Sequence, residues 1–222
     1  MQQKYLTRND ARAALADMKS FHDECKDLYT RHGFNLLDNL GRRNIILSQA
    51  QEKYFADALS KKFENVRNDG RTGEPDIIIG ELKKELECKL TSRHKGGAIS
   101  FQSDYHTLLQ KESLDYLYVI ADENFGAFAV LHFEGLSVDD FRPLSTGSRG
   151  KVAMFKHKGM KKCNILCGDV VSINEKNLEK LHKKLLNGQL PASKRQKIQK
   201  SIQYWQKTPT KYSYILEPLN EN

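Results

Sequence analysis

Apolar residues recur at helical spacing near the start of the chain, which predicts a first helix over residues 8–31. A second helix is expected from Ser48, whose hydroxyl suits an N-cap, through about Val66. The next apolar runs are short: DIIIG at residues 76–80 and ELECKL at residues 85–90. Because only a tight turn separates them, they predict a β-hairpin.

The pattern downstream of the hairpin alternates between helical and strand-like segments. A helix is expected over residues 100–111, followed by buried strands over 114–121 and 126–135. Two charged helices are expected near the end of the chain, at 174–185 and 192–207. Helix, hairpin, helix and further strands form an α/β order, so we predict an α/β fold with a central mixed sheet flanked by helices.

Positive charge is concentrated in the last third of the chain. Residues 151–222 contain 15 lysines and arginines against 5 acidic residues, whereas the first 150 residues contain 21 basic and 23 acidic residues. This asymmetry favours a polyanionic partner, although a solvated basic tail explains the charge equally well. We expect a core over residues 1–140 and a basic region over 141–222, within the same globular unit.

Several protein classes are excluded by what the sequence lacks. Its N-terminus has no apolar block typical of a signal peptide, and no apolar run approaches the ~18 residues of a membrane span. We therefore expect a cytoplasmic protein with no membrane partner, in which the four cysteines are reduced thiols. The sequence contains neither of the glycine-rich phosphate-binding motifs, G-x-G-x-x-G and G-x-x-x-x-G-K-[ST], so no nucleotide cofactor is expected.

The predicted hairpin brings charged residues together on one face. Side chains alternate along the second strand, so Glu87 and Lys89 share a face. If the hairpin pairs Ile79 with Lys84, Asp76 lies opposite Glu87, with roughly 5 Å between β-carbons. Two carboxylates that close repel each other unless a cation lies between them, and such an oxygen-rich pair suits Mg²⁺.

Two interpretations of the hairpin remain open. Strands that read E-x-E-x-K are common on half-solvated sheets, so an ordinary exposed hairpin accounts for the same residues. Glu52 on the preceding helix favours a functional site, because a carboxylate on a core-facing stripe needs a partner, such as a metal or Lys89. Its stripe contains four apolar residues: Phe55, Leu59, Phe63 and Val66. The alternative is a glutamate at the end of the stripe that reaches water.

The segments Pro75-Asp76 and Glu87-Cys88-Lys89 resemble the PD-(D/E)xK motif of the nuclease superfamily that includes most type II restriction endonucleases. The strand–turn–strand context is similar to the core of that family as well. The resemblance implies that Asp76 and Glu87 bind Mg²⁺ with the backbone carbonyl of Cys88, and that Lys89 orients or activates the attacking water.

The resemblance extends over about residues 48–135 and carries further implications. Glu52 matches the position at which a helix of this superfamily often supplies an additional acidic residue. Hydrolysis would leave a 5′-phosphate and a 3′-hydroxyl. Double-stranded DNA with palindromic sites implies a homodimer by symmetry, and a restriction enzyme acts in the cytoplasm of a prokaryotic cell.

Two segments are expected to contact DNA. Hydroxyls and positive charges follow the motif lysine and suit phosphate contacts: Thr91, Ser92, Arg93 and Lys95. A plain surface loop is the alternative. The segment STGSRGK at residues 145–151 is typical of a recognition loop, in which Arg149 could bind guanine with two hydrogen bonds. Ser148 and Lys151 are its other expected contacts.

Two other functions remain open. A structure-selective repair or junction-resolving nuclease could use the same core. A non-catalytic nucleic-acid-binding module could use the basic region alone and keep the hairpin for structure.

Overall fold

The computed structural model describes residues 4–68, 71, 74–92, 99–186 and 190–219. The chain divides into two compact units, Met1–Asp169 with Leu216–Asn222, and Val170–Ile215. The predicted boundary after residue 140 does not coincide with this division. Strand β8 (Cys163–Cys167) pairs with β6 (Ala127–Leu136) in the sheet of the first unit, and this pairing joins the intervening segment to the core.

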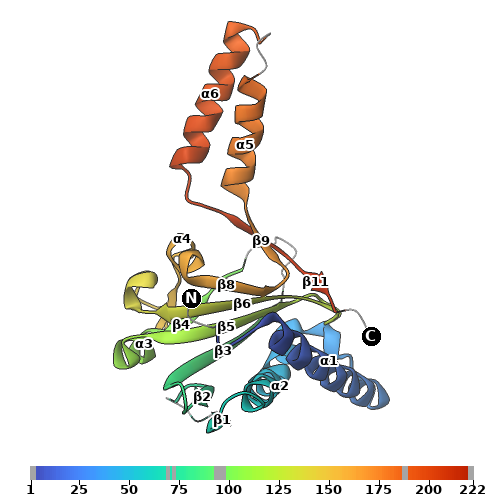
Figure 1. The fold of residues 1–222 in the computed structure, drawn as a ribbon. Helices are drawn as coiled ribbons and strands as arrows, with labels where there is room; N and C mark the ends of the chain where they lie inside the picture. Colours follow the sequence, from blue (N-terminus) through green and yellow to red (C-terminus); the bar gives the residue numbers. More distant parts are fainter. Residues whose placement is uncertain (1–3, 69–70, 72–73, 93–98, 187–189, 220–222) are drawn as a thin grey trace. The chain divides into compact units, whose positions relative to one another are not determined.

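The described part of the first unit is built on a mixed sheet of seven strands (Figure 1). Their order is β1-β2-β3-β5-β6-β11, with β8 also paired to β6. Strands β3 (Lys84–Ser92) and β5 (Leu114–Ala121) are parallel, and the other pairs are antiparallel. The remaining strands are β1 (Val66–Asn68), β2 (Ile77–Ile79) and β11 (Glu217–Pro218). The predicted α/β class with a mixed central sheet is confirmed.

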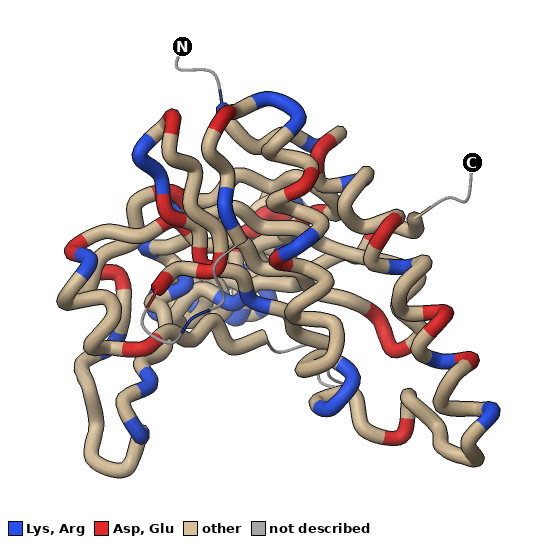
Figure 2. The backbone as a smooth tube through the Cα atoms, turned by 90° about the horizontal axis from the view of Figure 1, so that it is seen from below, with Lys and Arg blue, Asp and Glu red and all other residues tan. Residues whose placement is uncertain are grey.

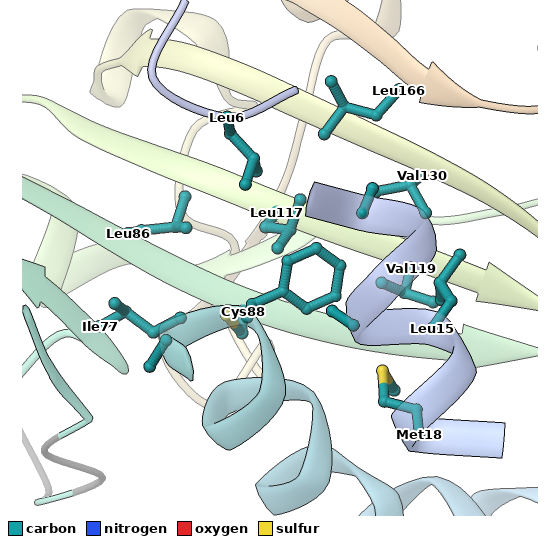
Figure 3. Close-up of a cluster of buried hydrophobic side chains, with 14 of the residues drawn as sticks. Leu6, Leu15, Met18, Ile77, Leu86, Cys88, Leu117, Val119, Val130 and Leu166 are labelled. Atoms are coloured by element: carbon teal, nitrogen blue, oxygen red, sulfur yellow. The ribbon is translucent and has the colours of Figure 1, made fainter. Parts of the chain in front are cut away.

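Two long helices, α1 (Arg8–Arg31) and α2 (Leu40–Ser60), cover one face of this sheet (Figure 1). Helix α1 begins and ends as predicted and buries Leu15 and Met18 against the sheet (Figure 3). Alternate residues of β3 enter the same core, including Leu86 and Cys88. No described helix is both long and apolar enough to cross a membrane.

The opposite face of the sheet is covered by short elements. Phe101 packs edge to face against Tyr118 and Phe133 there, with ring centroids 4.7 and 5.4 Å apart. These elements are β4 (Gln102–Asp104), α3 (Tyr105–Lys111), η2 (Val138–Asp140), β7 (Lys151–Ala153), α4 (Lys156–Gly159) and η3 (Met160–Lys162). A further short helix, η1 (Leu36–Asp38), joins α1 to α2. The helix predicted over 100–111 begins only at Tyr105, after strand β4.

The second helix differs from its prediction at both ends. Helix α2 begins at Leu40, where the side chain of Asn39 accepts a hydrogen bond from the Arg42 amide. Ser48 is no cap, since its hydroxyl donates to the carbonyl of Ile45 within the helix. The helix ends at Ser60, and Val66 instead begins β1 at the edge of the sheet.

The second unit contains a pair of helices, α5 (Ile173–Leu185) and α6 (Ala192–Lys207), which pack side by side (Figure 1). A two-stranded sheet of β9 (Asp169–Ser172) and β10 (Tyr212–Ile215) joins their ends. Buried Asn174 ties the pair together: its amide donates to the Thr208 carbonyl at 2.9 Å, and its oxygen accepts from the Lys211 amide at 3.0 Å. Both predicted C-terminal helices are confirmed.

A buried guanidinium holds α2 against the ends of three strands. Arg43 donates to the backbone carbonyls of Asp122 and Glu123, at 3.2 and 2.6 Å, in the turn between β5 and β6. It also donates to the hydroxyl of Ser92 at the end of β3, at 2.8 Å, and lies over the Phe125 ring. Because these acceptors are uncharged, the ion is stabilised by several hydrogen bonds rather than by one carboxylate.

We predict that Arg43→Met lowers the free energy of unfolding by about 2–4 kcal/mol, because it leaves buried carbonyls and a hydroxyl without their donor. Urea unfolding at constant pH measures the change. Arg42→Met is the matched control, since Arg42 is exposed on the same helix turn, and it should change stability by no more than about 0.5 kcal/mol. Equal effects of the two substitutions would contradict the role assigned to the buried guanidinium.

Candidate active site

The β2–β3 hairpin has the register that its sequence predicts. Ile79 lies opposite Lys84, and Ile77 lies opposite Leu86. Asp76 directly precedes β2, so it is the next residue along the register and faces the Glu87 position. Its carboxylate accepts a hydrogen bond from the Cys88 amide at 2.6 Å. The hydrogen bond holds the Asp76 carboxylate at the point where β2 ends and β3 continues.

The same hydrogen bond shows which way the Cys88 peptide groups point. In a β-strand the N–H and C=O of one residue point to the same side, as they do when paired residues exchange both hydrogen bonds. Since the Cys88 amide faces Asp76, the Cys88 carbonyl also faces the side where β2 has ended. A carboxylate and a carbonyl oxygen thus border the same region, as the resemblance implies.

Glu87 and Lys89 lie two residues apart on the face of β3 that points away from the α1–α2 core. Their side chains form an ion pair. Glu87 is 19% exposed and Lys89 35% exposed, so the pair is partly accessible to solvent. Burial by itself lowers the pKa of Lys89, but the charge of Glu87 and its hydrogen bond raise it above its usual value. Lys89 is therefore a stable cation beside Glu87.

Helix α2 adds a third carboxylate to this neighbourhood. Burial, followed by the charge of Asp76, raises the pKa of half-buried Glu52 to about 7, while Lys89 opposes the rise. Burial and the charge of Glu87 raise the pKa of Asp76 to about 6, with Lys89 and the Cys88 amide again opposing. Glu52 thus lies within the electrostatic field of Asp76, Glu87 and Lys89.

The helical stripe predicted for Glu52 is only partly correct. Phe55 and Leu59 are buried as expected, but Phe63 and Val66 lie beyond the end of α2 and belong to another segment. Glu52 therefore sits above the hairpin because of its place on α2, and the charge of Lys89 offsets part of its own.

The oxygen atoms around the hairpin are of the kind that a divalent cation binds. Within the described ranges, no three histidine, cysteine, aspartate or glutamate side chains converge as a preformed metal cage. Mg²⁺ does not need one, because it is usually held by one or two carboxylates, waters and substrate oxygens. Asp76, Glu87 and the Cys88 carbonyl are hard oxygen donors of the required kind, so the residues fit.

The predicted DNA contacts after the motif lysine have different outcomes. Thr91 is half-buried near the end of β3. Ser92 is buried, and its hydroxyl accepts from Arg43 and bonds to Asn44, so the predicted phosphate contact of Ser92 is wrong. Strand β3 runs two residues further than its apolar pattern indicated and draws Ser92 into the interior. Arg93 and Lys95 lie outside the described residues.

The predicted recognition loop packs beside the start of α3. The Gly150 carbonyl accepts from the Tyr105 amide at 2.8 Å, and Lys151 lies 3.8 Å from the Asp104 carboxylate. Arg149 is exposed, whereas the Ser148 hydroxyl is buried within the loop, which opposes its predicted DNA contact. The exposed side chains of the loop remain free to meet a ligand.

Tyr116 connects this region with the hairpin, and the sequence did not single it out. It lies beside Glu87 in the parallel register of β3 and β5, and its hydroxyl hydrogen-bonds to that of Ser103. Burial raises its pKa most, and the charges of Glu87 and Asp104 add to the rise. The buried phenol therefore lies within the electrostatic field of both regions. Its position in a continuous apolar run hid this role.

Comparison of the chain with protein-family models, curated proteins and solved structures found no match in any of the three.

We predict that Glu52→Gln removes part of a pH-dependent loss of stability. A carboxyl group whose pKa is raised on folding stabilises the protein fully below its unfolded pKa, about 4.3 for Glu. That stability is lost as the pH rises through the folded pKa of about 7. Urea unfolding in EDTA between about pH 5 and pH 8 should show a smaller decline for the variant than for the wild type.

Glu24→Gln is the matched control, because Glu24 is an exposed glutamate on α1. It should follow the wild-type pH dependence throughout. If Glu52→Gln declined with pH as steeply as the wild type, Glu52 would not share the electrostatic field of the hairpin.

Proposed function

We propose that this protein is a Mg²⁺-dependent endonuclease that cuts double-stranded DNA at specific sites, as type II restriction enzymes do. The observation that supports the proposal is the hairpin geometry: Asp76 accepts a hydrogen bond from the Cys88 amide next to the Glu87–Lys89 ion pair, and Glu52 lies within the field of these charges. Three carboxylates share a neighbourhood in which Lys89 is the cation that opposes their charges. A divalent cation would remove the remaining repulsion, and its substrate would be an anion that completes the coordination.

The chemistry assigned to each residue follows from its position. Asp76, Glu87 and the Cys88 carbonyl would hold the metal. Bound Mg²⁺ would supply Lewis acidity toward the scissile phosphate and a lower pKa for a coordinated water. Lys89 would leave its ion pair with Glu87 when that carboxylate binds metal, and its ammonium group would then orient the attacking water or contact a phosphate oxygen.

Glu52 has a supporting role in this proposal. Its carboxylate lies within the field of Asp76 and Glu87, and a bound cation would favour its ionised form, which could then support the metal-bound water. In-line attack would leave a 5′-phosphate and a 3′-hydroxyl. The proposal further includes a homodimer, because two cuts in palindromic DNA require two sites related by symmetry, and action in the cytoplasm of a prokaryotic cell.

Cleavage of a long linear duplex in Mg²⁺ tests the proposal. The wild type should produce discrete bands, whereas Asp76→Asn and Lys89→Met should slow cleavage by a factor of about 10² or more. Asp76→Asn removes the charge but keeps an oxygen that can accept from the Cys88 amide. EDTA should abolish cleavage by the wild type.

Glu85→Gln is the matched control for these substitutions. Glu85 lies on the same strand and pairs with Lys111 at 3.0 Å, apart from the proposed metal ligands. The control should keep cleavage within a few-fold of the wild type.

The three functions predict different outcomes of this assay. Nicking confined to branched DNA would identify a structure-selective nuclease with the same site. No cleavage by the wild type, with salt-sensitive binding retained, would make the hairpin structural and the protein a binding module. A loss in Glu85→Gln equal to that in Asp76→Asn would reject the assignment of the metal ligands.

A further inference from the structure

The second unit carries the entire net charge of the protein. Residues 170–215 contain 10 lysines and arginines against 2 glutamates, a net charge of +8, which equals the net charge of the whole chain. The first unit is thus balanced, with 26 basic and 26 acidic residues. Figure 2 shows both kinds interspersed along the backbone visible in that view. Charge separation between two folded units indicates that they meet different surroundings.

Helix α6 is the extreme case within this unit. Its 16 residues include five lysines and arginines and no acidic residue. None of the five forms an ion pair with a carboxylate in the described part of the chain. Like charges three and four residues apart repel and weaken a helix by roughly 0.2–0.5 kcal/mol per pair. A polyanion bound along the helix would offset this repulsion between the basic side chains.

Three of the four lysines of α6 fall on one stripe. Lys197, Lys200 and Lys207 are exposed and spaced by 3 and 7 residues, so they share a face with exposed Tyr204. The opposite side of the helix, around buried Ile202, packs in the helix pair. At 1.5 Å per residue, the stripe is ~15 Å long. Duplex DNA presents a phosphate charge about every 1.7 Å of its axis over such a length.

Helix α5 extends this surface. Lys176, Lys180 and Lys183 are exposed at spacings of 4 and 3 residues, again on one stripe, although Glu179 pairs with Lys183 at 2.7 Å and offsets one of the three charges. The buried side of α5 includes Asn174 and faces α6. Seen along each helix from its N-terminus, the lysine stripe is rotated in the same direction away from the buried face. Because the two helices are antiparallel, equal rotations bring both stripes to the same side of the pair, where they form one basic surface.

The nature of this surface favours a nucleic-acid backbone over a membrane. A helix that lies on a lipid surface needs an exposed apolar face next to its basic one. Here α5 and α6 pack against each other, and the large apolar side chains that this unit exposes among its described residues, Leu186, Tyr204 and Ile215, come from three separate elements and form no continuous helix face. Phosphate groups can be bound by lysines alone, without apolar insertion.

We propose that the α5–α6 pair is a duplex-binding arm, in which Lys197, Lys200 and Lys207 contact the DNA phosphates independently of base sequence. The proposal rests on the proposed endonuclease function only for the choice of polyanion. The arm would raise the affinity for any duplex and hold it while the first unit finds its site. Its contacts would make binding strongly dependent on salt.

The test is equilibrium binding of the full-length chain to a short labelled duplex by fluorescence anisotropy, in EDTA, at a series of salt concentrations. The triple variant Lys197→Ala, Lys200→Ala, Lys207→Ala keeps a strong helix former at each position. Its slope of log affinity against log salt should be smaller than that of the wild type by about 2–3, at roughly 0.9 per lost phosphate contact. Affinity at low salt should fall about tenfold or more.

The control variant is Lys26→Ala, Arg31→Ala, Lys61→Ala, which removes the same charge from exposed positions of the first unit. It should keep a slope close to that of the wild type, and circular dichroism should show that both variants retain their helices. An unchanged slope in the α6 variant, an equal change in the control, or wild-type binding to phosphatidylserine vesicles in place of duplex DNA would overturn the proposal. Because EDTA prevents metal-dependent cleavage, these results do not depend on whether the hairpin is catalytic.

Discussion

The alternation of side chains along β3 is the constraint on which the candidate site depends. Leu86 and Cys88 are buried in the core under α1 and α2, so Glu87 and Lys89 must lie on the other face. A shift of one residue would expose the core residues and bury two charges. Pairing with β2 on one side and β5 on the other holds this register. The charged face is therefore as firmly determined as the hydrophobic core.

The site is electrostatically unfavourable in the protein alone. Burial and the charge of Asp76 raise the pKa of Glu52, burial and the charge of Glu87 raise the pKa of Asp76, and the Lys89 ammonium offsets only part of these effects. A folded protein tolerates such repulsion when the surrounding structure holds the groups in place. Here α2 is held by the buried Arg43 guanidinium, and Asp76 is held by the Cys88 amide. These hydrogen bonds hold the carboxylates close together, and a cluster of carboxylates favours the binding of a cation.

The two units divide the work of binding a polyanion in the proposed function. The first unit has balanced charge, and its negative cluster would repel DNA unless a metal were present. The second unit has a surplus of lysines on exposed helix faces and no comparable cluster of acidic residues among its described positions. Attraction of DNA over a distance requires positive charge, whereas a metal site requires carboxylates. One chain can supply both when the lysines and the carboxylates lie on separate units.

Local periodicity was sufficient to predict much of this protein. The 3.6-residue period gave α1 its bounds, and the period of two predicted the hairpin and the pairing of Ile79 with Lys84. The same alternation placed Glu87 and Lys89 on one face. These features depend on neighbours in the chain, so the amino-acid sequence by itself determined them.

Only the tertiary structure decided the rest, because it depends on contacts between distant segments. Ser92 followed the motif as a polar residue, yet the guanidinium of Arg43, 49 residues earlier, draws it into the interior. Glu52 owes its raised pKa to Asp76 on another element, and Tyr116 owes its place beside Glu87 to parallel pairing across a helical crossover. Burial and electrostatic coupling are properties of the assembled fold. The sequence determined which side chains share a face, and the fold determined which of those faces meet.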